Sequence, residues 1–475
     1  MLISTRKSTA CLRASTLLLL VLAGCAANNV DLILTDATVL NVQSGQVHPD
    51  RHIVIDDGVI VAIEKSGQPL PSSDRVIAAG GRLLTPGLID VHHHTAYLLS
   101  DSITAGGGFI TRLSMAPDSI QAYRSTFAQA YLPYGVTAVR DAGSSEKNMA
   151  MLLAWTKPSP SSPDFYPVGG AIVSHEEGRP PYEGHTVVAN PEEAAQKVRH
   201  YHDLGIRHIK LYWRLRQAEF QAALAQARAL DLRVTGHIDF KVFSLAAALD
   251  EGLTSFEHAY TVGVGAMTDQ EYRDCWSIHV NQHFGDRPGG RFFLGALEYF
   301  NYLGDEHPKM LALIDRLSAV EGTVAPTLHI FAQRLGLTYF TTPSLGTFDQ
   351  TADLPDPMKV RAAAGYQRLA RYVRQMHKAG VRLTIGTDWR DPGKAVLSEM
   401  MLLQESGIPM RDVFRIATWN GAQAIGIEQD VGSIEVGKRA NLVLFSGNPL
   451  QNPRHLLGQR LVIKGGVVWQ DPASK

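Results

Sequence analysis

Hydrophobic and polar residues follow one pattern at the two ends of the chain and another in the middle. At both ends, short apolar runs rich in β-branched residues are broken by Asp-Gly or Gly-Gly pairs, which is typical of β-strands joined by tight turns. The runs lie at Asp31–Asn41, Arg51–Ile63, Gly432–Phe445 and Gly458–Trp469. Neither end alone has enough strands to cover its apolar face. We therefore expect one small β-sandwich assembled from residues 25–85 and residues 431–475.

The middle of the chain, residues 86–430, alternates strand-like and helix-like segments. Gly135–Asp141 and Val381–Asp388 are β-branched runs of strand length, whereas Glu219–Leu230 and Val360–His377 have the composition of helices. Further strand-like runs lie at Pro86–His94, Ile206–Tyr212, Leu232–His237, Ser255–His258 and Thr323–His329. About eight βα units favour a closed (β/α)8 TIM-like barrel over an open doubly wound sheet. The predicted fold class is therefore α/β, a barrel plus the composite β-sandwich.

One segment, at about residues 267–309, departs from this rhythm. It holds more aromatic and imidazole side chains than a barrel loop requires. They are Trp276, His279, His283, Phe284, Phe292, Phe293, Tyr299, Phe300 and Tyr302. Because long loops inside compact domains are usually functional covers, we interpret this insert as a lid or substrate wall. The alternatives are packing against the barrel exterior and a subunit contact.

The first 24 residues have the pattern of an export signal. A basic stretch ending at Arg13 precedes the apolar run Leu17–Leu22, which is too short to span a bilayer as a mature helix. Leu22–Cys25 resembles the lipobox of bacterial lipoproteins, which implies cleavage before Cys25 and lipidation of its thiol. With Ala26 following, we expect an outer-membrane lipoprotein that faces the periplasm. The alternative is an ordinary secretory signal and a soluble periplasmic protein.

Composition limits the function classes. A hydrophobic fraction of 45% and a charged fraction of 19% describe a globular chain with a large core. The net charge of -1 and the lack of a dense Lys/Arg patch argue against nucleic-acid binding. Of the 3 cysteines, Cys11 lies in the signal and Cys25 would be acylated. No intramolecular disulfide then remains for Cys275, which we expect to be a buried apolar residue.

Candidate metal ligands stand where the predicted strands end. Side chains of an extended strand alternate faces, so His92 and His94 point to one side and His93 to the other. Later strands are closed by Lys210, His237, His258 and Asp388. Because the C-terminal ends of parallel barrel strands converge on one face, these residues can surround one point. Imidazoles and a carboxylate in this arrangement suit zinc or a similar divalent ion.

The motifs around these residues resemble those of the amidohydrolase superfamily. They are Pro86–His94, Gly135–Gly143, Ile209–Lys210, Gly236–His237, Glu257–His258, Gly386–Asp388, Ala417–Thr418 and Gly432–Val443. Within the superfamily, the chain most resembles the branch of imidazolonepropionase-like proteins and metal-dependent Xaa-Pro dipeptidases. Two positions depart from the pattern. Asn441 stands where an acid is common, which we expect to affect only the β-sandwich, and Leu211–Arg214 is an unfamiliar continuation after Lys210 that leaves the substrate open.

The resemblance implies a site for two divalent ions, with zinc the expected metal. A protonated lysine cannot ligate a metal, because an ammonium has only donors. In the family this lysine is carboxylated by carbon dioxide, and the carbamate bridges the two ions. Carried over to this chain, the resemblance implies that His92, His94 and Asp388 hold the first ion. It implies that His237 and His258 hold the second. The alternative to a carboxylated Lys210 is an unmodified lysine held in an ion pair inside the barrel.

Such a site predicts hydrolysis of an amide or peptide C–N bond, in a dipeptide or N-acyl amino acid, by metal-activated hydroxide at a dinuclear centre. Asp388 would take the proton from the attacking water and pass it to the leaving amine. Tyr212 and Tyr260 are candidates to donate to the developing oxyanion. The candidate substrate-binding residues are Arg214 and Arg390, which match a carboxylate, and His185 and His329.

Other functions remain open on the same scaffold. A lactonase or another ester hydrolase would use the same dinuclear site. A deaminase of a heterocyclic base would commonly use one metal and no lysine on strand four, so Lys210 argues against it. A non-catalytic ligand-binding lipoprotein conflicts with the complete ligand set. The expected partners are a small-molecule substrate and, through the lipid anchor alone, the membrane; homo-oligomerisation is left open.

Overall fold

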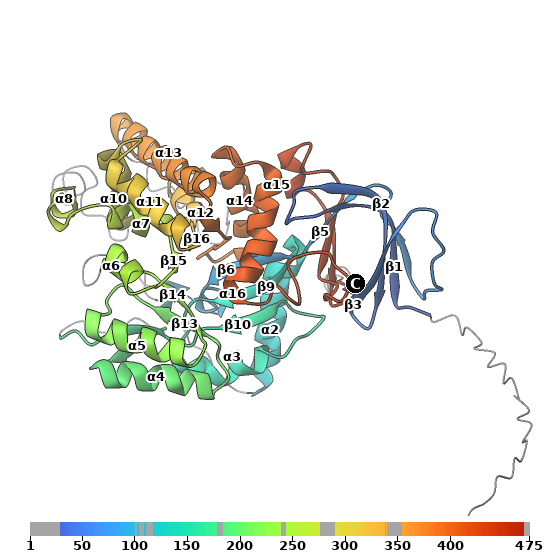
Figure 1. The fold of residues 1–475 in the computed structure, drawn as a ribbon, viewed down its shortest axis with the longest axis horizontal. Helices are drawn as coiled ribbons and strands as arrows, with labels where there is room; N and C mark the ends of the chain where they lie inside the picture. The colour runs from blue at the N-terminus through green and yellow to red at the C-terminus, as the bar shows by residue number, and fades with distance from the viewer. Residues whose placement is uncertain are drawn as a thin grey trace, which may run out of the picture.

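The computed structural model describes residues 29–99, 102–103, 109–110, 117–177, 184–238, 244–275, 290–337, 339 and 354–469. Figure 1 shows an α/β barrel with a smaller β-domain beside it, to which both the blue N-terminal and the red C-terminal strands contribute. The export signal and Cys25 lie outside the described residues, so cleavage and lipidation stay predictions. Across the described residues, no helix combines the length and the apolarity needed to cross a membrane.

The β-domain is an eight-stranded sheet built from both ends of the chain. Its strands are β1 (Leu32–Leu40), β2 (Val47–Asp56), β3 (Val59–Lys65), β4 (Val76–Ala78), β5 (Leu83–Pro86), β18 (Leu442–Phe445), β19 (Arg460–Lys464) and β20 (Val467–Val468). The first half of β1 pairs with β4 and the second half with β5, so the sheet divides along this strand. β18 lies antiparallel to β5 and seats the C-terminal strands beside the N-terminal ones. The predicted domain composed of both termini is confirmed.

Alternation along the strands places apolar residues on both faces of this sheet. Leu34 and Leu442 are fully buried in a core that belongs to the β-domain. Ile33, the neighbour of Leu34, faces a separate small cluster, because successive side chains of a strand point to opposite faces. Val443, next to Leu442, is likewise turned away and packs into the core of the barrel. The β-domain and the barrel are therefore packed against each other through β18.

The barrel strands are parallel. They are β6 (Leu88–His93), β9 (Val136–Asp141), β10 (Asp164–Pro167), β11 (Ala171–Ser174), β13 (His208–Leu211), β14 (Arg233–Gly236), β15 (Ser255–Glu257), β16 (Thr323–Ala325) and β17 (Arg382–Leu383). Hydrogen-bonded neighbours run β6-β9-β10 and β11-β13-β14-β15-β16-β17, with β12 (His185–Val188) on the free edge of β11. The N–H groups of Val91 and Asp388 donate to the carbonyls of Ile385 and His92, each at 2.8 Å, and join the last strand to the first. The predicted barrel is confirmed.

Helices surround these strands (Figure 1). The helices between or after barrel strands are α2 (Pro117–Tyr131), α3 (Met149–Trp155), α4 (Pro191–Asp203), α5 (Gln217–Ala229), α6 (Leu245–Asp250), α11 (Pro308–Ala319), α13 (Asp356–Ala379) and α14 (Pro392–Glu405). Further elements in the connections are α1 (Ala96–Leu99), β7 (Ser102–Ile103), β8 (Phe109–Ile110), α7 (Ala259–Gly265), α8 (Asp269–Asp274), α10 (Gly290–Leu303), α12 (Leu328–Arg334), α15 (Met410–Arg415) and α16 (Gly421–Ile425). α4 begins where Asn190 caps the N–H of Glu193 at 2.9 Å, and α13 ends at Gly380 in the left-handed conformation.

The described part of the aromatic insert packs on the exterior of the barrel. α10 lies against α13, and its Leu297 and Phe300 are buried. Glu298, also on α10, is fully buried and accepts from Arg361 of α13, with Nη2 and Oε2 2.7 Å apart. For α10 the structure therefore favours the packing alternative over a lid. The residues of the insert that lie outside the described part are Trp276, His279, His283 and Phe284.

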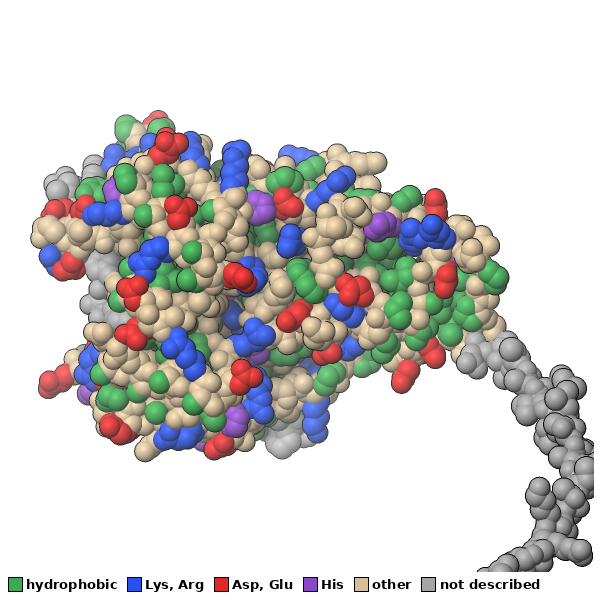
Figure 2. Space-filling model, viewed as in Figure 1, with side chains coloured by type: hydrophobic (Ala, Val, Ile, Leu, Met, Phe, Trp, Pro, Cys, Tyr) green, Lys and Arg blue, Asp and Glu red, His purple; other side chains and the backbone are tan. Residues whose placement is uncertain are grey.

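Surface charges of both signs are mixed on the face that Figure 2 presents. Lysine and arginine side chains alternate there with aspartate and glutamate over the barrel and the β-domain. A nucleic-acid-binding surface would gather basic side chains into a stripe or patch. On the face that Figure 2 presents, the described residues form no such stripe or patch.

A buried ion cluster joins the β-domain to the barrel. Asp164 of β10 accepts from Nζ of Lys464 at 2.9 Å and from Nη1 of Arg439 at 2.9 Å. The side chains of Lys464 and Asp164 are only 2% and 3% exposed. Nδ2 of Asn441 donates to the same carboxylate at 3.3 Å. The expectation that Asn441 affects only the β-sandwich was wrong, because its side chain reaches a strand of the barrel.

Asp164→Asn should destabilise the protein by about 3–5 kcal/mol, because it leaves buried cations without their counter-charge. The measurement is the free energy of unfolding in urea. The control is Asp269→Asn, which breaks the exposed ion pair with Arg273 and should cost about 1 kcal/mol or less. Equal losses in the two variants would contradict a special role for the buried cluster.

Candidate metal centre

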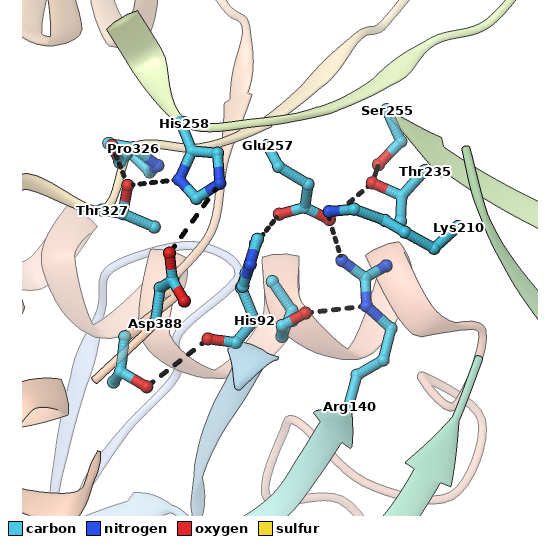
Figure 3. A network of polar contacts seen from close by, with 12 residues as sticks. His92, Arg140, Lys210, Thr235, Ser255, Glu257, His258, Pro326, Thr327 and Asp388 are labelled. Carbon is cyan, nitrogen blue, oxygen red and sulfur yellow. Dashed lines mark hydrogen bonds and ion pairs between the residues drawn. The ribbon is translucent and has the colours of Figure 1, made fainter. Parts of the chain in front are cut away.

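The predicted ligands meet at the end of the barrel where the strands finish. His92 and His94 come from the end of β6, and His258 and Asp388 follow β15 and β17. The ligand atoms of His92, His94 and Asp388 all lie within 4.8 Å of one another. Nε2 of His94 is 3.7 Å from Oδ1 of Asp388, and Nε2 of His258 is 3.9 Å from Oδ2. Figure 3 shows His258 and Asp388 turned toward each other beside His92.

Hydrogen bonds select the nitrogen that each imidazole offers to an ion. Nδ1 of His92 lies 2.6 Å from the carboxylate of Glu257, and Nδ1 of His94 lies 2.8 Å from the carbonyl of Gly143. Because carboxylates and carbonyls only accept, both Nδ1 atoms carry the proton and both Nε2 atoms keep a lone pair. A metal ligand needs that neutral form with one engaged nitrogen. The donor set therefore fits a divalent ion between His92, His94 and Asp388.

His258 follows the same logic through a threonine. Its Nδ1 is 2.9 Å from Oγ1 of Thr327, whose hydroxyl donates to the carbonyl of Pro326 at 2.8 Å. The oxygen of Thr327 is thus left to accept, so His258 carries its proton on Nδ1 and turns Nε2 toward Asp388. His93 behaves differently, since its ring packs against Tyr131 of α2 with centroids 5.5 Å apart.

Three residues at this end of the barrel hold a backbone conformation that non-glycine residues rarely adopt. His258, Thr327 and Asp388 have φ angles of 63°, 53° and 45°. Hydrogen bonds hold two of them in place, since the N–H groups of His258 and Asp388 each donate at 2.8 Å, to Ala325 and His92. Strain of this kind persists where the surroundings fix it, and it is common at functional sites. Here it turns the side chains of His258 and Asp388 into the centre.

An aromatic wall continues the centre toward the middle strands. The ring of His237 lies 4.7 Å from that of His258 and 4.7 Å from that of Tyr212, between centroids. The hydroxyl of Tyr260 is 2.7 Å from Nε2 of His237, which leaves Nδ1 as the nitrogen that His237 can offer to an ion. His185 extends the wall, with its ring 4.7 Å from that of Tyr212. The structure thus brings these five predicted residues together.

Lys210 is buried below the histidines. It is 1% exposed, and its Nζ has no hydrogen-bond partner among the residues that the structure describes. The nearest counter-charge is Oε1 of Glu257, at 3.7 Å. Burial lowers the pKa of Lys210 to about 8, an effect that Glu257 opposes and Arg140 reinforces. The amine therefore has a much larger neutral fraction near neutral pH than an exposed lysine.

Sequence reasoning assigned no role to Glu257, which occupies the centre of the network in Figure 3. It is fully buried and accepts from Thr235 Oγ1 at 2.6 Å and from Arg140 Nη2 at 2.5 Å, besides its contact with His92. Burial opposes ionisation of this carboxyl, but Lys210, His92 and Arg140 hold its pKa well below the usual range. The only signal in the sequence was its place next to His258.

Tyr97 of α1 is a second residue that the sequence did not single out. Its hydroxyl donates to Oδ1 of Asp388 at 2.9 Å. Burial and the negative charge of Asp388 raise the pKa of this phenol well above its usual value, so it remains a hydrogen-bond donor at ordinary pH. Tyr97 lies three residues beyond His94, a spacing that carries no recognisable pattern.

The predicted substrate-binding residues differ in their surroundings. Arg214 is buried and already paired with Glu176, with Nη2 and Oε2 2.9 Å apart. His329 is turned toward α14, where its Nδ1 is 2.9 Å from Oγ of Ser398. Arg390 is half-buried, two residues after Asp388, and burial lowers the pKa of its guanidinium. Arg214 and His329 thus have structural partners, and the substrate roles of all three stay predictions.

Comparisons with known proteins agree with this geometry. The model of the amidohydrolase family matches residues 367–468, which include Asp388. An imidazolonepropionase from Sphingopyxis alaskensis is 24% identical over 430 residues, which cover 85% of this chain and 91% of that protein. The structure of a prolidase complexed with N-methylphosphonate-L-proline is similar with a TM-score of 0.65 at 19% identity, covering 92% of this chain and 99% of that one. A 5-methylthioadenosine/S-adenosylhomocysteine deaminase from Moorella thermoacetica is 32% identical over 83 residues, 15% of this chain and 19% of that protein.

Over residues 367–468 the chain is similar to the amidohydrolase family, in line with the motifs of its sequence, and the solved structures share the fold that the sequence predicted. The chain spans only about a tenth to a quarter of the length of most of the curated relatives it matches, and the prolidase at 19% identity shows a shared fold. The substrate, the metal and its stoichiometry, and the state of Lys210 stay predictions.

Asp388→Asn and His94→Ala should each lower the divalent metal content of the purified protein. Either change removes a donor from the group of three that converge within 4.8 Å. The measurement is the metal-to-protein ratio by elemental analysis after identical purification. His377→Ala is the control, because His377 pairs with Asp412 near the start of β17 and not at the strand ends. Unchanged metal content in both site variants would contradict the assigned ligand set.

Proposed function

We propose that this protein is a metal-dependent amidohydrolase that cleaves an amide or peptide C–N bond in a dipeptide or N-acyl amino acid. The observation that carries the proposal is the convergence of His92, His94 and His258 on Asp388, each imidazole with Nε2 available. Imidazole and carboxylate are the ligands that catalytic zinc sites use. The overall similarity to an imidazolonepropionase and the shared fold of a prolidase support a C–N bond as the target.

We assign two divalent ions, preferably zinc, to this centre. The first ion would be held by His92, His94 and Asp388. The second ion would be held by Nδ1 of His237 and Nε2 of His258. When bound, such ions lower the pKa of water and polarise a carbonyl group. Lys210 is the proposed bridging ligand, as a carbamate. Its low pKa, about 8, supports this, because only the neutral amine can attack carbon dioxide.

The residues of the chain would handle the proton and the substrate. Asp388 is placed to accept the proton of the attacking water and to return it to the leaving amine. Tyr97 donates to Oδ1 of Asp388 and so orients the carboxylate. If Nδ1 of His237 holds an ion, its Nε2–H donates to the hydroxyl of Tyr260, so Tyr212 and Tyr260 both stay candidates to donate to the substrate carbonyl. Arg390 is our candidate for a substrate carboxylate, since Arg214 is already paired with Glu176.

A second candidate function is hydrolytic deamination of a heterocycle at a single ion. The observation that favours it is Nζ of Lys210 at 3.7 Å from Glu257, the ion pair that an uncarboxylated lysine would make. The local similarity to a 5-methylthioadenosine/S-adenosylhomocysteine deaminase supports the same candidate. In this case His92, His94 and Asp388 would hold the only ion, and Lys210 would stay an ammonium.

A substrate screen separates these functions. We expect turnover of N-acyl amino acids or Xaa-Pro dipeptides, measured by release of a free amine, and none of lactones. Asp388→Asn is the control and should reduce kcat by about 10²–10⁴-fold, because it removes the proposed proton acceptor. Release of ammonia from heterocyclic amines, with every amide inert, would replace the first candidate by the second.

Lys210→Ala should abolish hydrolysis of the substrate found in that screen, and short carboxylic acids such as acetate or propionate should restore part of it by supplying the missing carboxylate. Wild-type protein equilibrated with ¹³C-bicarbonate should show a carbamate carbon signal by NMR, which the variant lacks. Full activity of the variant, or no carbamate signal in the active wild type, would contradict the bridging role of Lys210.

A further inference from the structure

We propose that Glu257 is a positioning residue of the metal centre, and that it positions His92 by fixing the tautomer of its imidazole. The inference rests on the metal site proposed above and deepens it. Glu257 lies at the end of β15, and its carboxylate has two separate tasks. Oε2 is 2.6 Å from Nδ1 of His92, and Oε1 faces the donors of Arg140 and Thr235 and the charge of Lys210.

The carboxylate is needed on the His92 side because it can only accept. It therefore requires the proton of His92 to sit on Nδ1, and the lone pair then sits on Nε2, toward Asp388 and His94. A carboxylate behind a ligating histidine also raises the basicity of the ring and fixes its orientation. His92 is 1% exposed and Glu257 0%, so no solvent competes for this contact.

Arg140 prevents Glu257 from turning away. Its Nη2 binds Oε1, and its Nε donates to the backbone carbonyl of Val91 at 2.7 Å, next to His92. The guanidinium therefore joins the carboxylate to the strand that carries His92. Thr235 of β14 adds a second donor to Oε1 at 2.6 Å. These contacts leave Oε2 in one position, under Nδ1 of His92.

Glu257→Gln tests the tautomer directly, because a glutamine has the same shape but only one accepting end. Its oxygen should take the Oε1 position, where Arg140, Thr235 and Lys210 gather. Its NH2 group then lands at 2.6 Å from Nδ1 of His92, the distance of the present contact, and donates to it. The proton of His92 is moved to Nε2, the nitrogen that should bind the ion.

The experiment measures zinc affinity by competition with a chromophoric chelator, and the tautomer of His92 by ¹⁵N NMR of histidine-labelled protein. Glu257→Gln should bind zinc about 10–100-fold more weakly than wild type. The matched control is Glu298→Gln, another fully buried glutamate paired with an arginine, Arg361, but on the barrel exterior. It should leave zinc affinity and the His92 signals unchanged.

Equal zinc affinity in Glu257→Gln and wild type would overturn the inference, and so would equal weakening in Glu298→Gln. The wild type gives a test that needs no variant, since zinc-loaded protein should carry the His92 proton on Nδ1. A proton on Nε2 would refute the assignment even if Glu257→Gln fails to fold. The outcome is separate from the proposed reaction: weakened zinc binding in Glu257→Gln supports the inference even if every amide proves inert.

Discussion

The interior of the barrel below the metal centre holds several charged side chains that water does not reach. Because these charges must compensate one another, they constrain the residues of the metal centre above them. Arg140, Lys210 and Glu257 have side chains no more than 3% exposed. An isolated ion in such a place would cost several kcal/mol, so none of the three is free to change alone. Because Glu257 also binds Nδ1 of His92, the balance of buried charge and the geometry of a metal ligand depend on the same carboxylate.

A second buried acid, Asp90, links the closure of the barrel to the position of Asp388. Oδ1 of Asp90 on β6 accepts from the N–H groups of His92 and Thr387 at 3.1 and 3.2 Å, and Oδ2 accepts from the hydroxyls of Thr387 and Tyr131. The first strand is thereby joined to the segment after the last. Burial raises the pKa of Asp90 to about 7 in spite of these donors. Asp388, which follows Thr387, reaches the centre because this connection sets where the last strand ends.

The sequence was most informative where local periodicity and topology decide the outcome. Strand alternation predicted that His92 and His94 act together, and the rule that parallel strands end on one face predicted the approach of His258 and Asp388. Both depend on residue types and order alone. The composite β-domain followed from counting strands at each terminus.

Features that depend on contacts between distant residues were not accessible in this way. Tyr97 and Asp388 are 291 positions apart, and Asn441 and Asp164 are 277 apart. No local pattern says that a given tyrosine or asparagine will meet a given carboxylate. Glu257 was missed for a different reason, because a lone glutamate at the end of a short strand identifies neither its partners nor their number. The left-handed backbone at His258 and Asp388 directs both side chains into the centre. The sequence gives no sign of it, because neither position is a glycine.

Charge balance explains why Lys210 fits both of its proposed states. As an ammonium, Lys210 together with Arg140 cancels the negative charges of Glu257 and Asp388. As a carbamate it would leave the buried site with a large excess of negative charge, which only bound divalent cations can offset. If the dinuclear proposal holds, the ion pair with Glu257 belongs to the protein without cations and the carbamate to the protein with them. Carboxylation of Lys210 and metal uptake should then be coupled.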